Sequence, residues 1–198
     1  MKKTIEFYFD FGSPTAYLAH TQMKRFQRDY DVTIQYKPML LGGVLKATGN
    51  RPPGAVPAKG QYMLAHDLPR FVKRYQVPFK MNPFFPINTL TIMRGCYATM
   101  DLGCFETYVD TLFNAMWVEE KNLGTPNELV AVLRDAKIDA EKFLELIGTD
   151  SVKDSLKLET QRAVDRGVFG APTLFVGNNM YFGQDRLDFI EEELQLSI

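Results

Sequence analysis

The sequence predicts an α/β fold in which one sheet is interrupted by a long series of helices. Residues 5–36 have the pattern of strand, helix and strand, residues 59–167 carry helix signals without strand signals, and two short apolar runs follow at 171–183. A strand–helix–strand unit of this length forms a right-handed parallel crossover. The predicted order is therefore βαβ, a helical block, and ββα.

The first predicted strand, at 5–9, ends in a turn that opens a helix. Both of its alternating sets of residues are largely apolar or aromatic, as in a strand covered on both faces. Gly12 permits a sharp turn, Ser13 is a preferred N-cap, and Pro14 suits the first helical position. The Ser13 hydroxyl should thus lie at the positive end of a helix dipole, which favours an anion such as a thiolate. In isolation the Ser-Pro pair favours the structural alternative, a helix cap and nothing more.

The helix predicted from Pro14 to about Tyr30 leads into a second strand around residues 32–36, which Pro38 stops. From residue 42 Gly and Pro are too dense for regular structure, except for a short helical turn at 44–47.

A loop this long inside a compact domain is often functional, and Asn50 and Lys59 are its candidate ligand-binding residues. The structural alternatives are a turn residue with a left-handed backbone for Asn50 and a solvated helix start for Lys59.

The middle of the chain is predicted to be helical throughout. Trp117 belongs to an apolar stripe at helical spacing, which favours the core of a bundle, with the wall of a substrate pocket as the alternative. The expected helices are 59–76 with an interruption at Pro69, 88–102, 105–120, one that starts at 125–128, 140–147 and 151–166.

The last segment is predicted to be a hairpin followed by a helix. Two apolar runs at 171–183 flank Gly177-Asn178-Asn179, which is a strong hairpin signal, and Asp185 is expected to open the final helix.

Composition excludes several classes of function. With 23 basic and 24 acidic residues, the net charge of −1 provides no general attraction for nucleic acid or an anionic membrane. The N-terminal apolar run is too interrupted for a signal peptide or a membrane span, so a cytoplasmic protein is expected. Cys96 and Cys104, placed in one helical stretch about 12 Å apart, are expected to be free thiols. His20 and His66 share no metal-binding pattern, so no metal site is expected.

The segment Gly170-Ala171-Pro172-Thr173 before the hairpin resembles the thioredoxin superfamily, in which this proline is cis and faces the start of the active-site helix. DsbA-like members carry Cys-Pro-x-Cys at that helix start, whereas this chain has Ser13-Pro14-Thr15-Ala16. Disulfide exchange is therefore not expected, because no sulfur is present at the helix start.

Four segments in order, at 7–19, 49–63, 112–117 and 168–187, resemble kappa-class glutathione transferases and 2-hydroxychromene-2-carboxylate isomerases. This resemblance implies a thioredoxin-like fold of the DsbA/kappa type with a large all-helical insertion. The thioredoxin-like parts would be 1–58 and 151–198, with the insertion at 59–150. It also implies a homodimer and glutathione as the cofactor.

The resemblance further implies a role for each of several residues. Ser13 would contact the glutathione sulfur, and the Ala171 backbone before Pro172 would pair with the cysteinyl unit. Gln184 and Asp185 would hold the γ-glutamyl end of glutathione. Asn50 and Lys59 would hold its glycyl end.

The leading hypothesis is a glutathione-dependent isomerase that interconverts 2-hydroxychromene-2-carboxylate and trans-o-hydroxybenzylidenepyruvate, a small aromatic carboxylate substrate. The alternatives are a kappa-type transferase that conjugates glutathione to electrophiles, and a thioredoxin-like binding module without catalytic activity.

Overall fold

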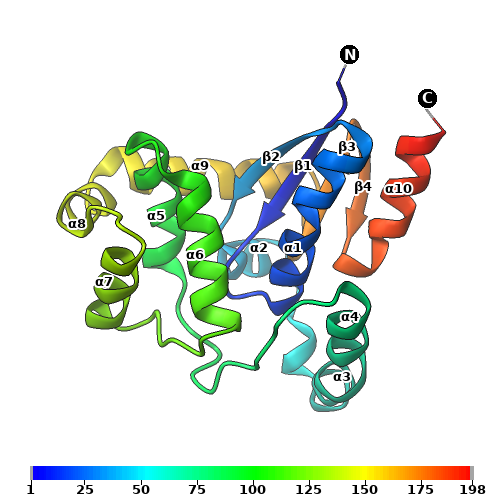
Figure 1. Cartoon of the computed structure of the whole chain (residues 1–198), viewed down its shortest axis with the longest axis horizontal. Coiled ribbons are helices and arrows are strands. Elements are labelled where there is room, and N and C mark those ends of the chain that lie inside the picture. Colours follow the sequence, from blue (N-terminus) through cyan, green and yellow to red (C-terminus); the bar gives the residue numbers. More distant parts are fainter. Residues whose placement is uncertain (1, 197–198) are drawn as a thin grey trace.

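A computed structural model describes residues 2–196, and its elements follow the predicted order (Figure 1). No helix in this range is long and apolar enough to cross a bilayer. The strands and α-helices are β1 (Thr4–Phe9), α1 (Pro14–Tyr30), β2 (Thr33–Pro38), α2 (Leu41–Thr48), α3 (Pro57–Tyr62), α4 (Leu68–Tyr75), α5 (Leu90–Asp101), α6 (Phe105–Trp117), α7 (Pro126–Asp135), α8 (Ala140–Ile147), α9 (Asp150–Asp165), β3 (Thr173–Val176), β4 (Asn179–Phe182) and α10 (Leu187–Gln195).

The four strands form one mixed sheet in the order β2-β1-β3-β4. β1 runs parallel to β2 and antiparallel to β3, and β3 and β4 form the predicted antiparallel hairpin. The register places Phe7 of β1 between Tyr36 of β2 and Leu174 of β3. The thioredoxin-like βαβ…ββα arrangement with its inserted helices is thereby confirmed.

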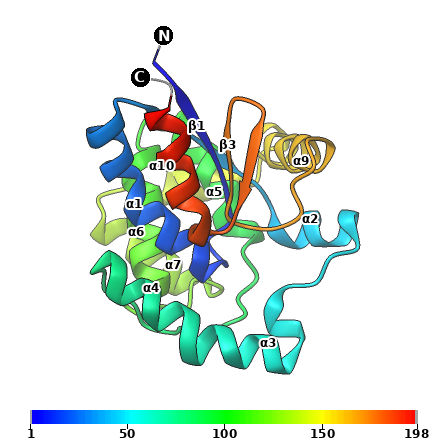
Figure 2. The same ribbon diagram turned by 90° about the vertical axis from the view of Figure 1, so that its right-hand side faces the viewer.

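Both faces of the sheet are covered, as the aromatic content of β1 predicts. Helices α1 and α10 lie on one face, and α2 and α9 lie on the other (Figure 2). Because successive side chains in a strand point to opposite faces, Phe7 and Phe9 join the core beneath α1, whereas Tyr8 packs with Val44 of α2 and Ala163 of α9.

The inserted helices pack directly on the end of β1. Phe113 of α6 lies 5.6 Å from the Phe9 ring and 4.9 Å from the Phe11 ring. Trp117, also on α6, is fully buried in this shared core, so the interpretation as core is confirmed and the alternative of a pocket wall is wrong. The boundaries 1–58, 59–150 and 151–198 stay a prediction.

The two cysteines do not share a helix, and this prediction was wrong. Helix α5 ends at Asp101, and Gly103 adopts a left-handed φ of +70°, which reverses the chain before α6 begins. Cys96 is buried in α5, whereas Cys104 precedes α6; both are free thiols. The distance inferred from one continuous helix therefore does not apply.

The segment from Leu41 to Tyr75 is more helical than predicted. The chain stays helical through Pro69, because a π-helical turn at Met63–Asp67 joins α3 to α4. The α-helical hydrogen-bond pattern is nevertheless interrupted just before Pro69, which has no N–H to donate. Helix α2 has two turns instead of one, and it ends at Gly49, whose φ is +66°.

Candidate functional site

A cavity of about 840 Å³ lies where the N-terminus of α1, the loop after α2 and the turn before α10 meet. These elements come from opposite ends of the chain, and the sheet brings them together (Figure 2). Pro172, the seventh predicted site residue, does not itself line the cavity, but it directly follows Ala171, which does. Six of the seven predicted site residues line it, namely Ser13, Asn50, Lys59, Ala171, Gln184 and Asp185.

Ser13 connects the start of α1 to the loop before β3. Its Oγ accepts a hydrogen bond from the Ala16 N–H at 3.1 Å, which is the predicted N-cap. The same hydroxyl donates to the carbonyl of Ala171 at 3.0 Å. The peptide bond between Ala171 and Pro172 is cis, as the resemblance implied. The hydroxyl thus faces the loop at the positive end of α1.

The turn before Ser13 is held by Asp10, which the sequence analysis did not single out. The buried Asp10 carboxylate accepts hydrogen bonds from the Gly12 N–H at 2.8 Å, the Leu41 N–H at 2.8 Å and the Thr89 hydroxyl at 3.0 Å. Burial raises the pKa of Asp10, and these three hydrogen bonds oppose that effect. Asp10 therefore ties the turn that carries Ser13 to the start of α2 and to the residue before α5.

Gly12 is needed for close packing and not for a left-handed turn. Its φ lies outside the left-handed region, but a Cβ there would lie 3.0 Å from Thr89 Cγ2 and 3.3 Å from Asp10 Oδ1. Next to it, the Phe11 carbonyl accepts a hydrogen bond from the Trp117 indole at 2.8 Å. Through this hydrogen bond, Trp117 of the helical insertion holds the turn that precedes Ser13.

Thr15 is a second hydroxyl beside Ser13. Its Oγ1 lies 3.0 Å from Ser13 Oγ and 3.3 Å from the Ala171 carbonyl oxygen, to which it donates. The side chain is half-buried and lines the cavity. From sequence, Thr15 was considered only as part of a segment without cysteine. Its hydroxyl group, two residues after Ser13, could have identified it as a candidate site residue.

Asn50 joins the loop after α2 to the segment before β3. Its side-chain amide donates to the Phe169 carbonyl at 2.8 Å, and its Oδ1 accepts from the Arg51 N–H at 2.8 Å. The left-handed backbone expected as the alternative lies at Gly49 and not at Asn50. Asn50 therefore supports the shape of the cavity through its own contacts.

Two cations line the cavity without an acidic partner. Lys59, in the first turn of α3, is exposed, and so is Arg51 in the loop before it. Neither forms an ion pair with any residue in 2–196. The sequence analysis missed Arg51, although it directly follows Asn50. This part of the cavity attracts carboxylates.

The turn before α10 contributes Gln184 and Asp185. The prediction that Asp185 opens the final helix was wrong, since both residues lie in a 3₁₀ turn, Gln184–Arg186, that precedes α10. The Asp185 carboxylate pairs with Arg186 at 2.6 Å. The hydroxyl of Tyr75 on α4 donates to the Gln184 carbonyl at 2.8 Å, and burial raises the pKa of Tyr75 to about 12. Helix α4 thereby fixes the position of this turn.

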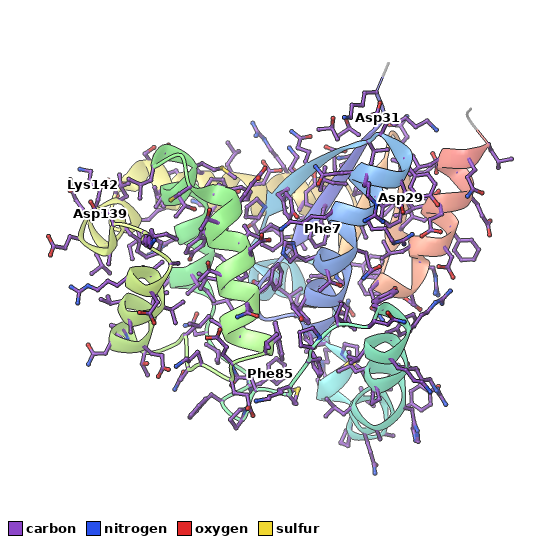
Figure 3. The ribbon with its side chains drawn as sticks, viewed as in Figure 1. Phe7, Asp29, Asp31, Phe85, Asp139 and Lys142 are labelled. Carbon is purple, nitrogen blue, oxygen red and sulfur yellow. The ribbon has the colours of Figure 1, made fainter. Side chains whose placement is uncertain are left out.

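Aromatic and aliphatic side chains form another part of the cavity wall. Phe85 lies in the linker between α4 and α5 (Figure 3), where its ring is 38% exposed and lies 5.8 Å from the Trp117 ring. Tyr17 and Trp117 are buried and do not line the cavity. The remaining apolar wall includes Leu41, Leu45, Met63, Leu68 and Phe71.

Comparisons with known proteins agree on the family of the chain. The model of the DsbA-like thioredoxin domain matches residues 4–195. A 2-hydroxychromene-2-carboxylate isomerase from Sphingobium xenophagum is 33% identical over 98% of this chain and 99% of its own. Glutathione S-transferase kappa 1 from Homo sapiens is 29% identical over 96% of this chain and 90% of its own. A solved structure of a 2-hydroxychromene-2-carboxylate isomerase superposes with a TM-score of 0.87 at 29% identity, covering 97% of this chain and 94% of that one.

Proposed function

The chain belongs to the DsbA-like thioredoxin family and, within it, to the group of 2-hydroxychromene-2-carboxylate isomerases and kappa-class glutathione transferases. From this premise we propose that it is a glutathione-dependent isomerase that interconverts 2-hydroxychromene-2-carboxylate and trans-o-hydroxybenzylidenepyruvate. One observation carries the proposal: a single cavity combines a helix N-terminal hydroxyl, two cations that form no ion pair within 2–196, and an apolar wall with aromatic rings that include Phe85.

The chemistry of the cavity fits glutathione, which carries a thiol, two carboxylates, an ammonium group and two peptide groups. Ser13 would donate to the sulfur, and Lys59 would attract the glycyl carboxylate. Asp185 would pair with the ammonium group in competition with its exposed neighbour Arg186. The backbone of Ala171, before Pro172, would pair with the cysteinyl unit.

Amide groups would complete the contacts to glutathione. One N–H of the Asn50 amide is used by Phe169, and the other remains for the glycyl end of the ligand. The Gln184 side chain, buried against the turn, would serve the γ-glutamyl end.

When bound, glutathione would supply a thiolate that adds reversibly to the β-carbon of the ring-opened enone, so that the former double bond rotates before the thiolate leaves. Ser13 would stabilise negative charge on the sulfur before addition and again at departure, and the α1 dipole would act in the same direction. Arg51 would orient the carboxylate of the substrate, and Phe85 would lie against its ring. The apolar side chains of Met63 and Phe71, which line the cavity, would limit access of water to the sulfur.

The second candidate is conjugation of glutathione to electrophiles, which the similarity to the human kappa-class transferase favours. The same thiolate site serves both reactions, and the difference lies in whether the sulfur leaves again. A binding module without catalysis is the third candidate.

An ultraviolet assay of the hydroxychromene interconversion, with and without glutathione, tests the proposal. We expect isomerisation only when glutathione is present, and full recovery of free glutathione by mass spectrometry after many turnovers. Stoichiometric accumulation of a stable conjugate would move the assignment to the transferase. Binding of glutathione without either reaction would favour the binding module.

We also propose a homodimer in the cytoplasm, where glutathione is kept reduced. The dimer is supported by the family resemblance, and the compartment by the unpaired state of Cys96 and Cys104. Sedimentation equilibrium should give the mass of two chains; the mass of one chain would contradict the dimer.

A further inference from the structure

We propose that Thr15 is a positioning residue that acts through Ser13 to stabilise the thiolate of the bound cofactor. The inference rests on the proposed use of glutathione and adds a role to a residue of that site. The observation that carries it is a cluster of two hydroxyls around one carbonyl, formed by Ser13, Thr15 and Ala171.

The hydrogen bonds of this cluster account for every proton in it. A hydroxyl has one proton to donate and two lone pairs to accept with. Ser13 Oγ accepts from the Ala16 N–H at 3.1 Å and donates to the Ala171 carbonyl at 3.0 Å. The Thr15 hydroxyl donates to the same carbonyl at 3.3 Å, which leaves one lone pair of Ser13 without a donor. Thr15 Oγ1, 3.0 Å away, is close enough to supply it.

A negative charge on the ligand sulfur changes which arrangement of protons is best. The anion attracts the Ser13 hydroxyl proton, which turns away from the Ala171 carbonyl and toward the sulfur. A lone pair of Ser13 Oγ then accepts a hydrogen bond from the Thr15 hydroxyl. Ser13 in this state accepts from Ala16 and Thr15 and donates to sulfur, so all of its hydrogen-bonding capacity is used. Hydroxyls that donate in series polarise one another, and the effect is larger in a partly buried site than in water.

The carbonyl of Ala171 is not left unsatisfied by this change. In the proposed mode of binding it accepts from the cysteinyl N–H of the ligand, which replaces the hydroxyl donors. Both hydroxyl protons are then free to point along the line from Thr15 through Ser13 to the sulfur. The contribution of Thr15 should therefore be seen in the ionisation of the thiol and not in the binding of a glutathione without an ionisable thiol.

Two variants separate the hydroxyl from the shape of the side chain. Thr15→Val keeps the branched shape and removes the proton, whereas Thr15→Ser keeps the proton. The thiol pKa of bound glutathione is measured from the ultraviolet absorbance of the thiolate during a pH titration. One ordinary hydrogen bond corresponds to a shift of about 0.4 to 1 pH unit, so Thr15→Val should raise the pKa by about that amount. Thr15→Ser should restore the wild-type value.

S-methylglutathione is the matched ligand control, because it cannot form a thiolate. Calorimetry should give the same affinity for it in wild type and in Thr15→Val. An unchanged thiol pKa in Thr15→Val overturns the role of Thr15 and leaves the proposed function standing. A parallel loss of S-methylglutathione affinity shows a structural role and overturns it too. A wild type that binds neither ligand overturns the inference together with the proposed function.

Discussion

The side-chain amide of Asn50 donates to the carbonyl of Phe169 across 2.8 Å, although 119 residues separate them in sequence. Phe169 lies two residues before Ala171, so this bond joins the loop that carries Arg51 to the segment that carries the cis bond. The exposed Asn50 amide thus helps to hold together two of the segments that form the cavity.

Asn50→Ala should therefore weaken glutathione binding by about five- to twentyfold, since it removes a neutral hydrogen bond and a ligand donor together. The thiol pKa of bound glutathione should change little, because Ser13 is not touched. Isothermal titration calorimetry measures the affinity, with Asn127→Ala on the exposed surface of α7 as the control. Equal affinity in wild type and Asn50→Ala would show that the bridge does not support the site.

Ser13→Ala should raise the thiol pKa of bound glutathione and lower the rate about ten- to a thousandfold. The lower part of this range corresponds to the loss of one hydrogen bond to a charged group, and the upper part to the loss of a donor that is preorganised at a transition-state charge. Affinity for S-methylglutathione should be largely retained. Stopped-flow absorbance gives the rate and a pH titration gives the pKa. Identical titrations of wild type and variant would remove Ser13 from its proposed role.

The fold was predictable because it depends on local signals. Alternation in β1, the Ser-Pro helix start and the Gly-Asn-Asn turn each act over a few residues, and the structure confirms the topology they predict. The break between the helices predicted at 88–102 and 105–120 was also located, and it falls at the left-handed Gly103. The error was the distance between Cys96 and Cys104, which was inferred as if one helix continued through this break.

Only those site residues could be predicted whose role follows from a local sequence motif. Asp10 holds the turn before Ser13 through hydrogen bonds from Leu41 and Thr89, and no local sequence pattern links these positions to Asp10. Arg51 became a candidate only when the structure showed that no acidic residue within 2–196 pairs with it. Contacts between distant segments decide both roles.

The pair formed by His20, which is largely buried, and the partly exposed Asp110 should make stability depend on pH in the acidic range. His20 Nε2 lies 2.9 Å from Asp110 Oδ1, and this hydrogen bond, followed by that from Lys24, lowers the pKa of Asp110 to about 2. A depressed carboxyl pKa contributes stability above the unfolded value near 4, and that contribution is lost as the pH falls toward 2.

Because Asp110 is 44% exposed, solvent screening reduces this contribution to about 1 kcal/mol. Urea unfolding at several pH values should show wild type more stable than Asp110→Asn by that amount at pH 5, and the gap should close near pH 2. Asp135→Asn, at an exposed position on α7 that forms no ion pair with the rest of 2–196, is the control. A gap independent of pH would contradict the assignment of the shift to this pair.

Lys59 and Arg51 should each bind the carboxylate of a different ligand, Lys59 that of glutathione and Arg51 that of the aromatic substrate. Lys59→Ala should weaken glutathione binding about tenfold with little effect on KM for the aromatic carboxylate, because its proposed partner is the glycyl carboxylate. Arg51→Ala should do the reverse. Steady-state kinetics at saturating concentrations of one ligand, with the other varied, measures each effect. If both variants changed the same constant, the two carboxylates would not be bound separately.

Phe85 should contribute to the binding of the aromatic substrate alone. Its ring packs against Trp117, and the residue is 38% exposed and lines the cavity, so a flat ligand gains stacking on a ring that is already held in place. Phe85→Ala should raise KM for the hydroxychromene about five- to twentyfold, while the glutathione affinity and the thiol pKa stay as in wild type. Phe84→Ala is the matched control, since Phe84 is exposed at 52% and does not line the cavity. If both alanine variants raised KM equally, the effect would come from the mobility of the linker and not from stacking on the Phe85 ring.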